Sequence, residues 1–105
     1  MKVLKVTTGN NGANALGIPT PDSVNGVVLA SGVAESITIP SGAKHVLFNA
    51  TADFYVAYSG TAAVITDTTD GSGSELNPTL RTLKTGDTLS VISESACNIT
   101  ACFYG

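Results

Sequence analysis

Apolar and polar residues alternate in short stretches from Val27 to the end of this 105-residue chain. Alternation with a period of two indicates a β-strand with one buried face. Turn residues, chiefly Gly, Pro, Ser and Asn, separate the stretches at spacings of about 8–12 residues. No helical period persists for two turns, and there is no internal repeat. The pattern predicts an all-β domain, a jelly-roll-like or Greek-key β-sandwich of about eight short strands.

The stretch from 44 to 58 is the expected centre of the core, because it holds the only His, two of the three Phe and two of the three Tyr. Its alternation predicts a hairpin of two apolar strands around a polar turn at 50–52. Both faces are apolar, so one should meet the opposite sheet. The other, with His45, Leu47 and Tyr55, needs cover from the N-terminal segment or from a second subunit. The strands predicted along the whole chain are 27–30, 35–39, 44–49, 53–58, 62–66, 79–83, 88–93 and 97–104.

Residues 1–26 lack this regular pattern and are rich in Gly, Pro and Asn from residue 9 onward, which makes regular structure unlikely there. We expect an extended N-terminal arm over 1–26 and a β-sandwich domain over 27–105. Apolar side chains on an arm should not remain in water, so the arm either wraps its own domain or docks on a neighbouring chain. These side chains are Val3, Leu4, Val6, Leu16 and Ile18.

The charge content narrows the classes of partner. Only 12% of the residues are charged, about half the usual share, and Thr, Ser and Asn supply the polarity. The net charge of −3 and five scattered Lys and Arg residues argue against nucleic-acid binding, which needs clustered cations. No segment approaches ~18 consecutive apolar residues, and the N-terminus lacks the apolar run of a signal peptide. We therefore expect a chain made in a cytoplasm, without membrane contact.

The two cysteines, Cys97 and Cys102, lie five residues apart in one predicted strand and so on opposite faces. At about 3.3 Å per residue their Cα atoms would be roughly 16 Å apart, beyond the ~7 Å limit of a disulfide. Two free thiols are expected.

Residues that carry catalytic chemistry are sparse. His45 is the only imidazole, and no Cys, Asp or Glu stands beside it, so we expect a structural or surface role. There is no G-x-S-x-G elbow, phosphate-binding loop or C-x-x-C pair. Asp67, Asp70 and Glu75 share a loop that offers oxygens to Ca²⁺, but their spacing does not fit an EF-hand, and Asp, Gly and Ser are also typical of a solvated turn. The sequence predicts no enzyme, no cofactor and no metal site.

An interaction surface fits the sequence better than a catalytic site, since Tyr is enriched where a contact surface has one wet edge. The alternative is that the tyrosines pack in the core or at its rim. Arg81 follows the segment 75–78 and is expected to pair with Glu75, which would fix that loop. The candidate interface residues are Val3, Leu4, Val6, Leu16, Ile18, Tyr55, Tyr58 and Tyr104.

From Ser36 to Gly105 the chain resembles a family of small virion proteins of tailed bacteriophages that are found with the capsid. The resemblance is carried by three stretches, of which the most characteristic pieces are Phe54-Tyr55-Val56, Glu75-Leu76-Asn77-Pro78 followed by Arg81, and Phe103-Tyr104. The three stretches are ESITIPSGAKHVLFNATADFYV, SGSELNPTLRTL and LSVISESACNITACFYG.

The resemblance implies a head decoration (cement) protein: a β-sandwich or jelly roll that forms dimers or trimers over the seams between capsid subunits. It implies the major capsid protein as partner, a homo-oligomer, and a place on the capsid surface of the virion, and the family offers no catalytic residues to carry over. The alternative is a carbohydrate- or receptor-binding β-module of a phage fibre, which would use exposed aromatic rings beside Asn and Asp, such as Tyr55, Tyr58 or Tyr104.

Overall fold

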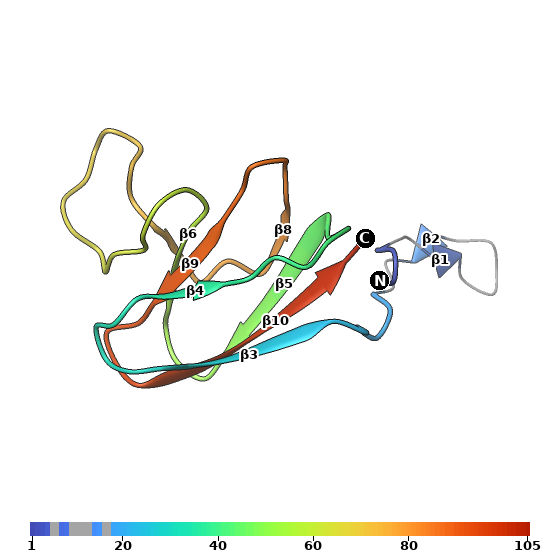
Figure 1. The fold of residues 1–105 in the computed structure, drawn as a ribbon, viewed down its shortest axis with the longest axis horizontal. Helices are drawn as coiled ribbons and strands as arrows, with labels where there is room; N and C mark the ends of the chain where they lie inside the picture. Colours follow the sequence, from blue (N-terminus) through green and yellow to red (C-terminus); the bar gives the residue numbers. More distant parts are fainter. Residues whose placement is uncertain (5–6, 9–13, 16–17) are drawn as a thin grey trace.

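The fold was obtained as a computed structural model, which describes residues 1–4, 7–8, 14–15 and 18–105. Two four-stranded antiparallel sheets pack as a β-sandwich (Figure 1). Sheet 1 consists, in spatial order, of β3 (Val24–Leu29), β10 (Cys97–Tyr104), β5 (His45–Ala50) and β8 (Leu80–Thr82). Sheet 2 consists of β4 (Glu35–Ile37), β9 (Leu89–Ile92), β6 (Tyr55–Ala57) and β7 (Glu75–Leu76). Two short strands, β1 (Thr7–Thr8) and β2 (Asn14–Ala15), pair with each other.

The strand order is that of a jelly roll. Counted along the chain with β3 first and β10 eighth, sheet 1 runs 1-8-3-6 and sheet 2 runs 2-7-4-5. The first strand thus pairs with the last, the second with the seventh, the third with the sixth and the fourth with the fifth. This nested pairing, divided between two sheets, defines the double-sheet jelly roll. The predicted fold class is confirmed.

The core lies between the two sheets, where the inward faces of their strands meet. In β10 the burial alternates, with Cys97, Ile99, Ala101 and Phe103 buried and facing sheet 2. The rings of Phe48 and Phe54 pack at a centroid distance of 5.9 Å and an interplanar angle of 54°, a tilted arrangement that aromatic pairs favour. The alternation in the sequence therefore identifies the inward face of β10 correctly.

The predicted hairpin at 44–58 is wrong, because its two strands belong to different sheets. β5 pairs with β10 and β8, whereas β6 pairs with β9 and β7. The link crosses between the sheets and is fixed at both ends: the Thr51 amide donates to the Asn98 carbonyl at 3.0 Å, and the Phe54 amide donates to the side-chain oxygen of Asn77 at 3.0 Å. Two buried strands around a polar turn fit a hairpin and a crossover equally well, so the alternation alone cannot distinguish them.

Other parts of the strand prediction also differ from the structure: β7 was not predicted, and β4, β6, β8 and β9 are two or three residues shorter than predicted. Residues 62–66 form no strand, although their apolar pattern predicted one; they belong to the loop between β6 and β7. Sheet 1 begins at Val24, three residues earlier than predicted, because 24–26 continue the ladder with β10 instead of belonging to the arm.

The described ends of the arm contact the sandwich beside the C-terminus (Figure 1). The Gly105 amide donates to the Lys2 carbonyl at 2.8 Å, and the Tyr104 hydroxyl donates to the Pro19 carbonyl at 2.9 Å. The Lys2 ammonium donates to the Thr20 hydroxyl at 2.8 Å. Between these ends, Val6 and Leu16 lie outside the described residues.

Candidate interaction surface

The outer face of sheet 1 is a broad surface that follows directly from the strand register. Side chains on one face of antiparallel strands lie opposite each other, so the partners in the ladders define the face. Val28 lies opposite Asn98, Gly26 opposite Thr100, and Thr100 opposite Asn49 on the next strand. Across the four strands this face carries Val24, Gly26, Val28, Asn98, Thr100, Cys102, Tyr104, His45, Leu47, Asn49, Leu80 and Thr82.

Among the described residues, this outer face carries no Asp, Glu, Lys or Arg. Tyr104 at one end of this face is buried, but the β3 edge and the centre of the face are open: Val24 and Val28 are 51% and 78% exposed, and Asn49, Asn98 and Thr100 are exposed. The alternation explains why, since these positions are the outward members of strands whose inward members fill the core. When another protein covers a surface of Val, Thr and Asn, no charge has to be desolvated, and the hydroxyl and amide groups can exchange water for hydrogen bonds to that protein.

The outer face of sheet 2 has the opposite character. Tyr55, Ala57, Ser90 and Ile92 point outward there, and all four are buried. Their cover comes from the loop between β6 and β7, where buried Ala62 and half-buried Val64 join the same cluster. The expectation that the N-terminal segment or a second subunit covers Tyr55 is therefore wrong, since the chain itself supplies the cover.

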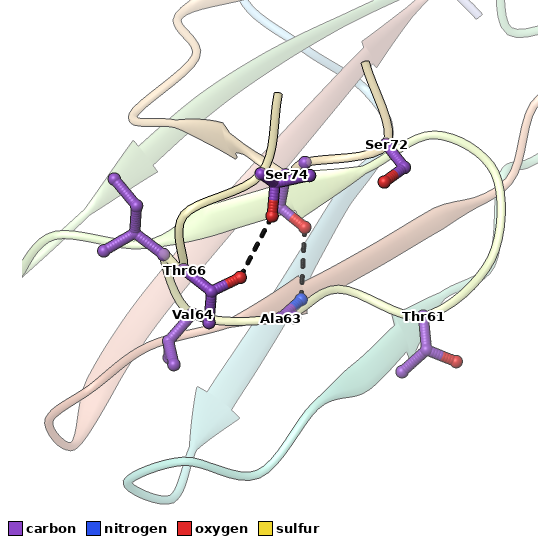
Figure 2. Close-up of a pocket in the computed structure, with 9 residues that line it drawn as sticks. Thr61, Ala63, Val64, Thr66, Ser72 and Ser74 are labelled. Carbon is purple, nitrogen blue, oxygen red and sulfur yellow. Dashed lines mark hydrogen bonds between the residues drawn. The ribbon is translucent and has the colours of Figure 1, made fainter. Parts of the chain in front are cut away.

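Hydrogen bonds hold this loop, named here the 61–74 loop, in place. The Ala62 amide donates to the buried Ser90 hydroxyl at 2.8 Å, which ties the loop to the middle of β9. The Ala63 amide donates to the Ser74 hydroxyl at 3.1 Å, which joins the two ends of the loop (Figure 2). The hollow between them, about 230 Å³, is lined by small hydroxyl and aliphatic side chains. These contacts give the loop a defined shape over sheet 2.

A charged cluster closes one side of the sandwich, where β7 and β8 are the edge strands of their sheets. Arg81 donates through Nε and Nη2 to both carboxylate oxygens of Glu75, at 2.8–3.2 Å, and the Tyr58 hydroxyl donates to Glu75 at 2.7 Å. Both charged residues sit on the inward side of their strands, opposite Val56 and Val46. They meet between the sheets, and the predicted Glu75–Arg81 pair is confirmed.

The cluster shifts the proton equilibria of its members. The hydrogen bonds from Arg81 hold the pKa of the Glu75 carboxyl below its usual value. Burial raises the pKa of the Tyr58 phenol above its usual value, and the adjacent Glu75 carboxylate raises it further. Beside the cluster is an open hollow of about 490 Å³, lined by Tyr58, Glu75, Arg81, Thr82, Lys84 and Asp87. Charged side chains of both signs gather in this hollow, in contrast to the outer face of sheet 1.

The structure disperses the predicted interface residues. Tyr55 and Tyr104 are 7% and 1% exposed, so a partner would reach either ring only after its covering segment moved away. Tyr58 is half-buried at the charged cluster. On the arm, Val3 and Ile18 are exposed and Leu4 is half-buried, while Val6 and Leu16 cannot be placed.

The open face itself was not among the predictions from the sequence, although its signal was present. The outward positions of the strands that form sheet 1 hold only uncharged residues. Which strands share a sheet could not be known from the sequence, so these positions could not be assembled into one surface.

The remaining candidate chemistry is structural. Cys97 is buried, Cys102 is half-buried on the outer face, and both are free thiols as predicted; burial raises the pKa of the Cys102 thiol. Nδ1 of His45 lies 3.3 Å from the Thr82 hydroxyl. Asp70 accepts hydrogen bonds from the amide and hydroxyl of Ser72. Within the described ranges, no three His, Cys, Asp or Glu residues are grouped so as to hold a metal ion.

The part of the chain that the structure describes has no helix long and apolar enough to cross a membrane. Comparisons with protein-family models, with curated proteins and with solved structures found no match.

Proposed function

We propose that this chain is a structural virion protein that binds and stabilises a phage capsid shell, as a decoration protein, through protein–protein contacts. The class of partner comes from the resemblance of residues 36–105 to head decoration proteins, and the major capsid protein is the proposed partner. The outer face of sheet 1 is the proposed contact surface. Under this proposal the chain is not an enzyme, and its place is the capsid surface.

The observation that carries the proposal is the uncharged, exposed outer face of sheet 1. The centres of protein–protein interfaces are depleted of charged residues, because a charge that is buried without a partner is costly. Val24 and Val28 supply apolar area, and Thr100, Asn98 and Asn49 supply hydrogen-bonding groups that adapt to a partner's backbone. Such a face suits a flat protein surface better than a small molecule, which prefers a concave site.

Stabilisation then follows from mass action. A protein that binds the expanded shell more tightly than the immature shell shifts the equilibrium towards the expanded form. Each contact is modest, at about 25 cal/mol per Å² of apolar area, and the symmetry of a shell repeats it many times. The outer face therefore needs only moderate affinity at each position.

The proposal is tested first by the genes beside the one that encodes this chain. Shells assembled from a neighbouring major capsid gene, in immature and expanded forms, are mixed with the purified chain and sedimented. We expect co-sedimentation with expanded shells. Thr100→Glu, at the centre of the outer face, should reduce occupancy at least tenfold, whereas Thr61→Glu, exposed on the 61–74 loop, should leave it unchanged. A wild-type chain that stays in the supernatant with both forms contradicts the proposal.

A carbohydrate- or receptor-binding module is the second candidate, and the hollow at the charged cluster favours it. The half-buried Tyr58 ring lies there beside Glu75 and Arg81, and sugar-binding sites combine an aromatic ring with planar charged groups that hydrogen-bond hydroxyls. Glycan-array binding by the isolated chain, abolished by Arg81→Ala and retained by Thr100→Glu, would support this function. Binding to empty heads with no glycan signal would exclude it in favour of the decoration role.

A further inference from the structure

The four edge strands of the sandwich are protected unequally. An edge strand presents unpaired N–H and C=O groups, and proteins limit this hazard with short strands, charges and proline. β7 has two residues and includes Glu75, β8 has three and includes Arg81, and β4 has three and includes Glu35. β3 has six residues, with neither a charge nor a proline (Figure 1). It is the one long, unprotected edge among the described strands of the sandwich.

The backbone groups open on this edge can be assigned from the register. The Phe103 amide donates to the Ser23 carbonyl at 2.9 Å, so odd-numbered residues of β3 bond to β10. Hydrogen bonding alternates along an antiparallel pair. The N–H and C=O groups of Val24, Gly26 and Val28 therefore face away from β10. The same three residues place their side chains on the outer face, where the two valines are exposed.

Nothing in the described part of the chain requires glycine at position 26, in the middle of β3. The backbone φ of Gly26 is not positive, so no left-handed turn requires glycine there. A Cβ added at Gly26 would meet nothing within 4 Å, so no close packing in the chain requires it either. Glycine weakens a strand interior and often marks a place where another backbone approaches closely. The backbone of another molecule at this edge would account for glycine at this position.

We propose that β3 pairs antiparallel with β3 of a second copy of this chain, on a two-fold axis through Gly26. The pairs are then Gly26 with Gly26 of the copy, and Val24 with Val28 of the copy on either side. The open groups of Val24, Gly26 and Val28 fall in the hydrogen-bonded positions of this ladder, so both partners satisfy them together. An isologous contact of this kind is self-complementary, which is the requirement for a closed dimer.

Two copies of a chain of net charge −3 repel each other overall. β3 limits this repulsion where the copies would meet, because an uncharged strand brings no like charges into direct opposition. In this register Asp22 meets Ala30 of the copy, not another carboxylate. Each exposed valine meets a valine, so apolar area is buried against apolar area. Cross-strand apolar pairs of this kind stabilise a sheet.

The area that such a contact buries sets the expected strength of the dimer. A six-residue edge is about 20 Å long, and the sandwich at this edge is about as thick as the ~10 Å spacing between sheet 1 and sheet 2 of one chain. The footprint is therefore a few hundred Å² per partner, below the ~800 Å² per partner of stable complexes. The dimer should be weak and concentration-dependent. Pairing would join sheet 1 of one copy to sheet 1 of the other in one continuous eight-stranded sheet, with an uncharged outer face on both halves. This pairing does not depend on what the outer face binds.

The test combines association with cross-linking that is specific for the register. Sedimentation equilibrium of the full chain up to about 1 mM should show a monomer–dimer equilibrium. Gly26→Pro removes an N–H that faces the open edge and spares the ladder with β10, and Val28→Lys places a charge on the edge. Both should shift the equilibrium to monomer. Thr100→Lys, opposite Gly26 on β10 and one strand in from the edge, is the matched control and should remain dimeric.

In a Cys102→Ser background, Gly26→Cys should form a disulfide-linked dimer on mild oxidation, because paired Cα atoms lie ~5.5 Å apart. Val28→Cys should not, because its counterpart is about 13 Å away in this register. A chain that stays monomeric at every concentration and does not cross-link at Gly26→Cys overturns the proposal. Efficient cross-linking of Val28→Cys alone also overturns it, and so does cross-linking of Gly26→Cys to shell proteins with none between two copies of this chain.

Discussion

The outer faces of the two sheets differ in whether the chain covers them, although both arise from the same alternation of inward and outward side chains. Sheet 2 directs Tyr55, Ala57 and Ile92 outward, and the 61–74 loop covers them. Sheet 1 directs Val24 and Val28 outward, and the described chain leaves them open. Both outward-facing tyrosine rings are covered, Tyr55 by the 61–74 loop and Tyr104 at the end of sheet 1 that contacts Pro19, and small β-branched side chains are left on the open part of sheet 1. The chain covers sheet 2 with its own loop, where exposure of Tyr55 and Ile92 would be most costly, and leaves small uncharged side chains on the face that is proposed to bind a partner.

The largest expected effect on this contrast comes from Tyr55→Ala. Removal of a buried ring leaves a cavity under the 61–74 loop, and truncation of a large buried side chain costs about 3–5 kcal/mol. Val28→Ala, which removes an exposed side chain from the other face, should change stability by less than about 0.5 kcal/mol. Urea unfolding followed by circular dichroism measures both. Similar losses for the two variants would mean that the faces do not differ.

An intermediate effect is expected from Ser90→Ala. The Ser90 hydroxyl is buried and accepts the Ala62 amide, so its removal leaves a buried N–H without a partner, at a cost of about 1–3 kcal/mol. Ser74→Ala removes a similar hydrogen bond, to Ala63, where water can replace it. Its cost should be at most about 0.5 kcal/mol. Amide hydrogen exchange at Ala62 should accelerate in Ser90→Ala only; equal protection in both variants would show that β9 does not hold the loop.

The smallest effect concerns the Glu75–Arg81 pair, which joins the edges of the two sheets. The hydrogen bonds from Arg81 lower the pKa of Glu75 in the folded state. The ion pair therefore stabilises the fold fully above the unfolded pKa of Glu, about 4.3, and this stabilisation is lost as pH falls through the folded pKa. Both side chains are partly exposed, at 38% and 40%, so Glu75→Gln should cost no more than about 1 kcal/mol at pH 7. The difference from wild type should vanish near pH 2. A constant difference across this range would assign the loss to packing.

The sequence predicts the strands better than their partners. Alternation in 97–104 identifies the inward face of β10, and local spacing identifies the Glu75–Arg81 pair. The hairpin at 44–58 fails because a crossover between sheets and a tight hairpin need the same residues, buried strands around a polar turn. Local pattern contains no information on which sheet a strand joins.

The segment 62–66 fails for a related reason. Ala62 and Val64 are buried as the pattern predicts, but against the outer face of sheet 2 and not within a ladder. A period of two in the sequence indicates which side chains are covered, but it does not indicate which part of the protein covers them. The open face of sheet 1 could not be predicted for the same reason, since its residues come from four strands that are far apart in the sequence.

The place of β10 in the sandwich has a consequence for the growing chain. β10 is the last strand in the sequence, yet it lies between β3 and β5 and bonds to both. At about 5–20 residues per second, β3 waits several seconds on the ribosome before this partner is made. During that interval both edges of β3 are open, and non-local pairing of this kind is slow even afterwards. A premature stop within β10 would therefore not trim a terminal strand but remove the centre of the sheet, leaving two uncharged strands free to aggregate.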